Sequence, residues 1–148
     1  MTHWKDRFRV IISVYLILLN ENGEVLLLRR QNTGYKDGEF GLPAGHVDGN
    51  EELKTAMQRE AMEEVGVRVS GEDLELAHVM HRFCGDHERV DFFFTCHHWE
   101  GEPCNCEAEK CSELKWMPFD QIPDDAIDYY KQAFNHIREG SLYSAFNW

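Results

Sequence analysis

The chain has 148 residues, of which 43% are hydrophobic, which is enough to build one domain spanning residues 1–148 around a single core. Its formal net charge of −12 at pH 7 argues against a general nucleic-acid binder, because Lys and Arg supply the affinity for phosphate chains. Small phosphorylated ligands remain compatible with this charge if a metal and a few local cations offset it.

The N-terminal part of the chain predicts two β-strands. Residues 7–19 are dense in β-branched and aromatic side chains, the turn sequence NENG occupies residues 20–23, and a second apolar run covers residues 24–28. This order is typical of a β-hairpin or of two neighbouring strands. The run at residues 10–19 follows basic residues, as in a secretory signal, but it lacks a small-residue cleavage site and is too short to span a bilayer. We therefore expect no membrane association.

Two arginines end the second apolar run, and the loop after them adds an aromatic and a basic side chain. Arg29 and Arg30 would be ordinary surface charge in many proteins, but beside an acidic metal site such arginines bind phosphate oxygens. In the loop, Tyr35 offers a stacking surface and Lys36 a further cation. We expect these four residues to bind a phosphorylated substrate.

A short strand, a tight loop and a helix are predicted next. Residues 40–45 read FGLPAG, in which Pro43 forces the preceding residue toward extended geometry. The helix has Asn50 as its expected N-cap, two glutamates at residues 51–52 in the first turn, and Gly66 just past its end. Both ends of this helix are therefore marked in the sequence.

Three carboxylates share one face of the predicted helix. At about 100° per residue, Glu60, Glu63 and Glu64 fall within an arc of about 100°, and Arg59 lies beside Glu63. A glutamate-rich helix face is usually solvated surface. However, like charges at this spacing repel each other, and Arg59 can neutralise only one of them. The cluster therefore leaves enough negative oxygen for a divalent metal.

The second half of the chain predicts three more strands and another helix. Residues 74–84 and 89–99 read as a hairpin, and the three consecutive phenylalanines at residues 92–94 indicate a strand covered on both faces. Residues 113–117 predict a short strand, and residues 124–138 predict a helix with an apolar core stripe. The C-terminal segment SLYSAFNW is apolar enough either to pack back on the domain or to form a homodimer contact.

Five cysteines at uneven spacing favour free thiols in a reducing cytoplasm over a disulfide framework, and we expect a cytoplasmic protein. Three of them, Cys104, Cys106 and Cys111, follow the pair His97 and His98, so a zinc site is an alternative. Their spacing does not match a common structural zinc pattern, which favours loop or semi-buried thiols.

The spacing around the helix resembles the signature of the Nudix hydrolases. The pattern runs Gly, five residues, Glu, seven residues, Arg-Glu, two residues, Glu-Glu, one residue, Gly, and every specified position is filled by Gly45, Glu51, Arg59, Glu60, Glu63, Glu64 and Gly66. Seven matches at this spacing are a strong signal. The resemblance is most specific over residues 45–67, and it implies the family's fold, a mixed β-sheet between helices in an α/β/α sandwich.

The resemblance also implies a chemistry, hydrolysis of a diphosphate linkage with Mg²⁺ or Mn²⁺ held by Glu60, Glu63 and Glu64. Glu60 or Glu64 would be the principal ligand, with Arg59 orienting a carboxylate. By position, the backbone carbonyl of Ala44 and the side chain of Glu107, or Glu109 in its place, would complete the site. The general base varies within the family, and Glu63, Glu107 and His81 are the candidates.

The substrate is expected to be a nucleoside diphosphate joined to another group: a nucleoside triphosphate, a nucleotide sugar or a dinucleotide. The MutT branch reads a purine partly through an asparagine beyond the last strand, and the matching segment PDDAIDYY has none. One alternative is a catalytically silent nucleotide-sensing or protein-interaction module. Such relatives usually lose carboxylates of the signature, and none is lost here. Another is a capped RNA end, which would need Arg29, Arg30, Lys36 and Arg82 presented as one basic strip.

Overall fold

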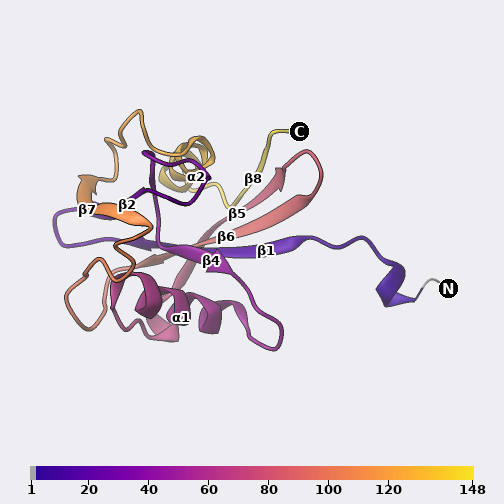
Figure 1. The fold of residues 1–148 in the computed structure, drawn as a ribbon, viewed down its shortest axis with the longest axis horizontal. Coiled ribbons are helices and arrows are strands. Elements are labelled where there is room, and N and C mark those ends of the chain that lie inside the picture. Colours follow the sequence, from indigo (N-terminus) through magenta and orange to yellow (C-terminus); the bar gives the residue numbers. More distant parts are fainter. Residues whose placement is uncertain (1–2) are drawn as a thin grey trace.

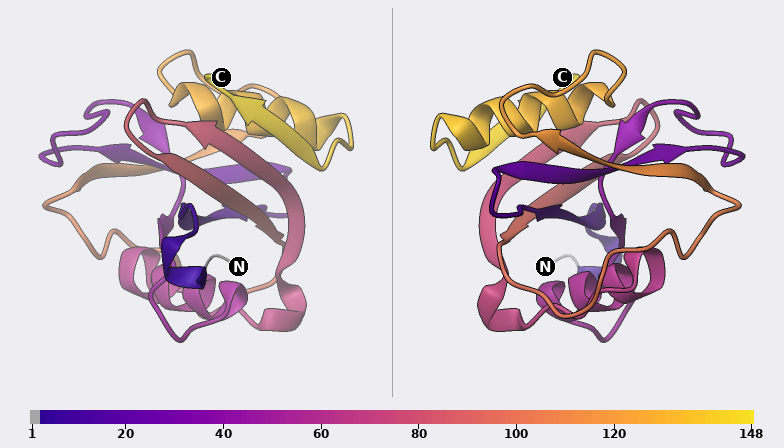
Figure 2. Two further views of the ribbon diagram at one scale, coloured as in Figure 1. Left: turned by 90° about the vertical axis from the view of Figure 1, so that its right-hand side faces the viewer. Right: turned by 90° about the vertical axis from the view of Figure 1, so that its left-hand side faces the viewer.

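The computed structural model describes residues 3–148, in which two α-helices lie on opposite sides of eight β-strands (Figures 1 and 2). The helices are α1 (Leu53–Val65) and α2 (Asp128–Arg138), and short 3₁₀ turns occur at Trp4–Asp6 and Gly71–Asp73. The strands are β1 (Ile11–Leu18), β2 (Glu24–Arg30), β3 (Phe40–Gly41), β4 (Ala44–His46), β5 (Glu75–Phe83), β6 (Glu88–Cys96), β7 (Cys111–Pro118) and β8 (Tyr143–Phe146). The predicted mixed sheet between helices is confirmed.

The strands divide into two sheets. The larger has the order β4-β1-β6-β5-β8, in which β1 pairs in parallel with β6 and β5 with β8, and the smaller has the antiparallel order β3-β2-β7. Strands β1 and β2 thus belong to different sheets and share only a bridge between Leu19 and Val25. The sequence predicted either a β-hairpin or two neighbouring strands for residues 7–28. The structure shows two neighbouring strands, and the hairpin alternative is wrong. The predicted hairpin of β5 and β6 is confirmed.

Strands β1 and β6 are buried on both faces because the helices cover them from opposite sides. Tyr15 and Phe93 belong to the core on the α2 side, whereas Leu16 and Phe94 belong to the core on the α1 side. Each fully buried side chain of this size stabilises the fold by about 1.5–3 kcal/mol relative to an exposed one. The run of phenylalanines therefore serves two cores, as expected.

The start of α1 differs from the prediction. Asn50 has φ 65°, a left-handed conformation in a turn, so it cannot adopt the extended geometry of an N-cap. Glu52 is the N-cap instead, and its carboxylate accepts a hydrogen bond from the Lys54 N–H at 2.9 Å. Glu51 therefore lies outside the helix. The predicted end is confirmed, because Gly66 has φ 68° and its N–H donates to the Met62 carbonyl.

The C-terminal part of the chain packs against the larger sheet. Helix α2 begins at Asp128 rather than residue 124, because the preceding segment forms backbone hydrogen bonds with both the N–H and the carbonyl of Phe40. After α2, strand β8 pairs with the edge of β5, and the Trp148 indole stacks on Phe83 and donates to the His81 carbonyl at 2.9 Å. The segment SLYSAFNW thus packs back on its own chain. Within residues 3–148, no helix has the length and apolar character needed to cross a membrane.

Candidate active site

Helix α1 and strand β4 approach most closely at Gly45. A Cβ atom at this position would lie 2.0 Å from Glu60 Oε1 and 2.1 Å from Glu60 Cδ, closer than any real contact of this kind. The backbone at Gly45 does not have a positive φ, so its conformation does not demand glycine. Glycine is required here because the Glu60 side chain leaves no space for a Cβ atom. The contact presses the Glu60 carboxylate against the strand and leaves its side chain 12% exposed.

Arg59 joins the carboxylates at this end of the helix. Its Nη1 donates to Glu60 Oε1 at 2.8 Å and to Glu63 Oε2 at 3.4 Å, while Nη2 donates to Glu51 Oε1 at 2.8 Å and to the His46 carbonyl at 3.2 Å. The hydrogen bond with Glu51 raises the pKa of Arg59 and lowers that of Glu51. One permanent cation thus orients three acidic side chains, each contributed by the signature.

Glu64 lies deeper than the other carboxylates. Its Oε2 accepts a hydrogen bond from the Ala44 N–H at 2.7 Å. The pKa of Glu64 is raised to about 8, mainly by burial and also by the nearby carboxylates of Glu60 and Glu107, against the lowering effect of the hydrogen bond from Ala44. Burial also raises the pKa of Glu60, and Arg59 acts against that shift. The site therefore contains more carboxylate than its cations compensate.

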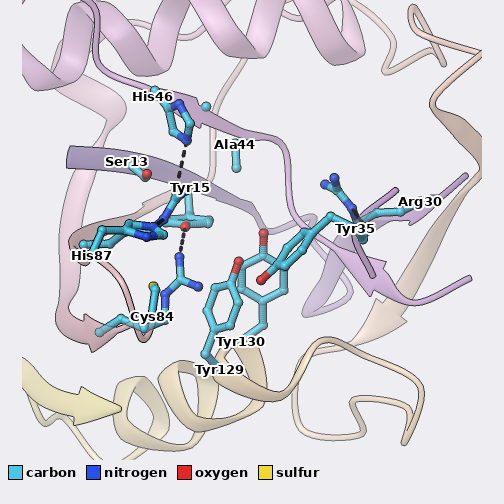
Figure 3. A pocket seen from close by; sticks show the side chains of 13 residues that line it. Ser13, Tyr15, Arg30, Tyr35, Ala44, His46, Cys84, His87, Tyr129 and Tyr130 are labelled. Atoms are coloured by element: carbon cyan, nitrogen blue, oxygen red, sulfur yellow. Dashed lines mark hydrogen bonds between the residues drawn. The ribbon is translucent and has the colours of Figure 1, made fainter. Parts of the chain in front are cut away.

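Two adjacent cavities open beside β4. The carboxylate cavity, of about 390 Å³, is lined by Glu64 and Glu107 together with Arg29, Arg30 and Lys110. The tyrosine cavity, of about 370 Å³, adjoins it at β4 and is lined by residues that include Tyr15, Tyr35, Tyr129 and Tyr130 (Figure 3). Arg30 and the three residues of β4 line both cavities, so one extended ligand can occupy the two together.

The signature and this geometry match known proteins. The NUDIX domain family model matches residues 10–137. The chain belongs to the Nudix hydrolase family. It is similar to an RNA pyrophosphohydrolase of Wolbachia sp. subsp. Drosophila simulans (strain wRi), with 24% identity over 94% of this chain and 92% of the relative. Identity to the 8-oxo-dGTP diphosphatase of Escherichia coli (strain K12) is 28% over 63% of this chain and 70% of the relative.

Solved structures agree with this assignment. The crystal structure of a MutT protein from Methanosarcina mazei Go1 superposes with a TM-score of 0.77 at 26% identity, over 90% of this chain and 96% of the other. The chain is therefore a MutT-like Nudix hydrolase, and the fold that the signature implied is the fold observed.

The predicted substrate-binding residues of this Nudix hydrolase occupy different environments. The Arg30 guanidinium donates to the Tyr35 carbonyl at 2.8 Å and to Thr33 Oγ1 at 3.2 Å, which fixes it between the two cavities. Arg29 also lines the carboxylate cavity, but it forms ion pairs with an aspartate and a glutamate of neighbouring segments. Tyr35 lines the tyrosine cavity, and Lys36 is not among the residues lining either one.

Of the remaining predicted residues, some line a cavity and others do not. Glu107 lines the carboxylate cavity, with its side chain 34% exposed and 3.8 Å from Lys110 Nζ. Glu63 is half exposed and faces Arg59, and neither Glu63 nor His81 lines a cavity. His81 instead bonds Glu88 at 2.8 Å through Nε2. The catalytic and metal-binding roles of the named residues stay predictions.

A hard dication fits the chemistry of these donors. Among residues 3–148, no group of three or more His, Cys, Asp or Glu side chains is already gathered around one metal position. Even so, the carboxylates of Glu60 and Glu107 lie close enough to Glu64 to raise its pKa. A bound cation would relieve this repulsion between carboxylates. Oxygen ligands of this kind select Mg²⁺ or Mn²⁺ over softer metals.

Within residues 3–148, no third His, Cys, Asp or Glu side chain joins Cys104 and Cys106 in a group that could hold zinc. The Sγ atoms of Cys104 and Cys106 lie 3.0 Å apart, whereas the Cys111 thiol is directed to the Glu113 carbonyl. Both sulfur atoms lie beside Gly66, where a Cβ would be 2.9 Å from the Cys104 Sγ. The thiol pair therefore packs against the end of α1, and neither of its cysteines lines the carboxylate cavity.

Sequence reasoning missed part of the tyrosine cavity. The missed lining residues come from β1, β4 and the β5–β6 hairpin, and they are Ser13, Tyr15, His46, Cys84, His87 and Arg89, whereas Arg82 was named only for the alternative of a capped RNA end. Only His46 had a local signal, because it directly follows the first glycine of the signature. The others meet through strand pairing, which motif spacing does not show.

Proposed function

We propose that this Nudix hydrolase cleaves a diphosphate linkage in a nucleoside diphosphate joined to another group, with Mg²⁺ or Mn²⁺ as its cofactor. The observation that carries the proposal is the carboxylate cavity of about 390 Å³, whose lining includes both Glu64 and Glu107 and both Arg29 and Arg30. The acidic oxygens of this lining suit a dication, and its guanidinium groups suit phosphate oxygens.

The residues of the chain divide the work of the reaction. Glu60, Glu64 and Glu107 would hold the metal, joined by the Ala44 carbonyl and by Glu63. When bound, Mg²⁺ or Mn²⁺ supplies Lewis-acid neutralisation of the charge on the phosphate oxygens. Arg59 keeps the carboxylates of Glu51, Glu60 and Glu63 in fixed orientations, so little reorganisation is needed during the reaction.

Arg30 is the better placed of the two phosphate-binding arginines. The charge of Arg29 is already balanced by Asp125, 2.8 Å away, and by Glu113 at 3.5 Å. Arg30 donates only to neutral oxygens and forms no ion pair within residues 3–148. Its cationic charge is therefore available to the substrate at the junction of the two cavities. Of the three candidate bases, Glu107 is the one that lines the carboxylate cavity.

The test is a panel of nucleoside triphosphates, nucleotide sugars and dinucleotides, incubated with Mg²⁺ or Mn²⁺ and scored for the phosphate and nucleotide products. We expect Glu64→Gln to lower turnover by at least about 1000-fold with the fold retained. Glu102→Gln, at an exposed position, is the matched control and should keep full activity. Unchanged turnover in Glu64→Gln would contradict the proposal, and no turnover by the natural chain with any substrate would favour the silent-module alternative.

A triphosphate at the 5′ end of RNA is a second candidate substrate, because a relative named RNA pyrophosphohydrolase matches over 94% of this chain. The charge opposes long RNA: the net charge is −12, Arg82 is only 6% exposed and Arg29 is ion-paired. These residues therefore do not form one exposed basic strip with Arg30 and Lys36. Hydrolysis of a 5′-triphosphorylated dinucleotide but not of a longer RNA is the expected result at low salt.

A further inference from the structure

The tyrosine cavity has an unusual charge for this protein. The chain carries 27 acidic and 15 basic residues, yet the cavity lining contains Arg30, Arg82, Arg89, His46 and His87 and no aspartate or glutamate. The whole protein has a net charge of −12, whereas the charged side chains that line this cavity are all basic. Such a cavity attracts an anionic group.

Arg89 carries an uncompensated charge at this cavity. Its Nε donates to His87 Nε2 at 3.0 Å, and its Nη1 donates to His46 Nε2 at 2.8 Å. A histidine ring carries no negative charge in either protonation state, so neither partner balances the charge of the guanidinium.

The acid nearest to this arrangement lies outside the cavity. Asp86 bonds His87 Nδ1 at 2.7 Å, but its side chain is 89% exposed and solvent screens its charge. The histidines thus orient the guanidinium of Arg89 without neutralising it. Arg30, at the other end of the cavity, is likewise free of an ion pair within the described chain.

Arg82 has a different role, because its charge is balanced. Its Nε donates to Asp91 Oδ2 at 2.8 Å, and Asp91 Oδ1 accepts from the Tyr15 hydroxyl at 2.9 Å. The same guanidinium lies 3.8 Å from the centre of the Tyr129 ring. Because the charge of Arg82 is balanced within this buried network, Arg89 and Arg30 are the lining arginines that can bind an anion.

We propose that the tyrosine cavity binds a phosphomonoester, so that the preferred substrate carries a phosphate on its nucleoside in addition to the diphosphate that is cleaved. The inference rests on the proposed function for the position of that diphosphate. Arg30 and β4 line both cavities, which places the nucleoside beside the exposed ring of Tyr35 and its phosphate near Arg89. A guanidinium held in a fixed orientation is a good partner for a phosphate.

The proposal is tested with substrate pairs that differ only by one phosphate, NADP⁺ against NAD⁺ and coenzyme A against dephospho-coenzyme A. We expect the phosphorylated member of at least one pair to have a kcat/KM about tenfold higher, mainly through KM. Adenosine 3′,5′-bisphosphate or adenosine 2′,5′-bisphosphate should also bind about tenfold more tightly than AMP in calorimetry with EDTA present. This binding requires neither metal nor turnover.

Variants of Arg89 identify the group responsible. Arg89→Gln should abolish the preference within each pair, and Arg89→Lys should retain part of it because the charge is kept. Arg68→Gln is the matched control: it removes the same charge from an exposed ion pair elsewhere and should keep the full preference. A loss of the preference in Arg68→Gln would show an effect of net charge alone.

Two results would overturn the proposal. One is equal kcat/KM within both pairs, together with equal binding of AMP and both bisphosphates. The other is an Arg89→Gln variant that weakens both members of each pair equally, since Arg89 would then act on the shared diphosphate. Binding of a bisphosphate without any turnover would support the phosphate site and count against the proposed function, so the two failures are distinguishable.

Discussion

Gly45 offers a direct test of how closely the carboxylate of Glu60, a proposed metal ligand, is positioned. In Gly45→Ala the backbone is not strained, because φ at this position is not positive. The added Cβ would nevertheless lie 2.0 Å from Glu60 Oε1, 2.1 Å from Cδ and 2.7 Å from Cγ, where 3.0 Å is the practical minimum. The carboxylate must therefore move by about 1 Å, a displacement that can lower a catalytic rate about 100-fold.

The cost in stability should be much smaller than the cost in activity. Moving Glu60 breaks its 2.8 Å hydrogen bond with Arg59, which is partly exposed and keeps its other carboxylate partners. We therefore expect a loss of about 1 kcal/mol in the free energy of unfolding. The measurements are kcat/KM on the best substrate of the panel and urea denaturation of the same samples.

Gly49→Ala is the control, since it lies in the loop that follows β4 and has nothing within 4 Å of the added atom. It should change neither quantity. A second check combines Gly45→Ala with Glu60→Gln: if the alanine acts through Glu60, the double variant should be little worse than Glu60→Gln alone. Full activity of Gly45→Ala would refute the reasoning, because the position of Glu60 would then not matter.

Three further predictions concern stability. Asp91→Asn should lower the free energy of unfolding by about 3 kcal/mol in urea denaturation, because it leaves Arg82 buried without its anion; Arg68→Ala, at an exposed pair, should cost under about 0.5 kcal/mol. Burial lowers the pKa of His78 in the folded protein. The neutral side chain therefore contributes its full share to the stability of the fold above the unfolded pKa of about 6.5, and this share is lost as the pH falls below that value. His78→Gln should therefore lose less stability than the natural chain between pH 7.5 and 5.5, and equal losses would contradict this. Deleting Trp148 should expose the β5–β8 edge, seen as faster amide hydrogen exchange there with α1 unaffected.

The signature helix was predictable because its information is local. Carboxylates at positions 60, 63 and 64 share a face through helix periodicity alone, and the helix ends at Gly66, whose missing side chain permits φ 68°. Its start was mispredicted, because the turn at Asn50 moves the N-cap to Glu52. Whether the helix begins after Asn50 or after Glu52 depends on Glu51. Its carboxylate lies outside the helix, where it accepts hydrogen bonds from Arg59 and from the Asp48 N–H.

The sequence by itself determined the family, the acidic helix, the layered α/β architecture and the arginines beside the site, because each depends on residue types at short fixed spacing. Only the tertiary structure decided that β1 and β2 belong to separate sheets and that a cavity without carboxylates adjoins the acidic one. That second cavity depends on contacts such as Tyr15 with Asp91, which lie 76 residues apart. Such contacts form when strands pair and cores close, and no local pattern in the chain encodes which strands will meet.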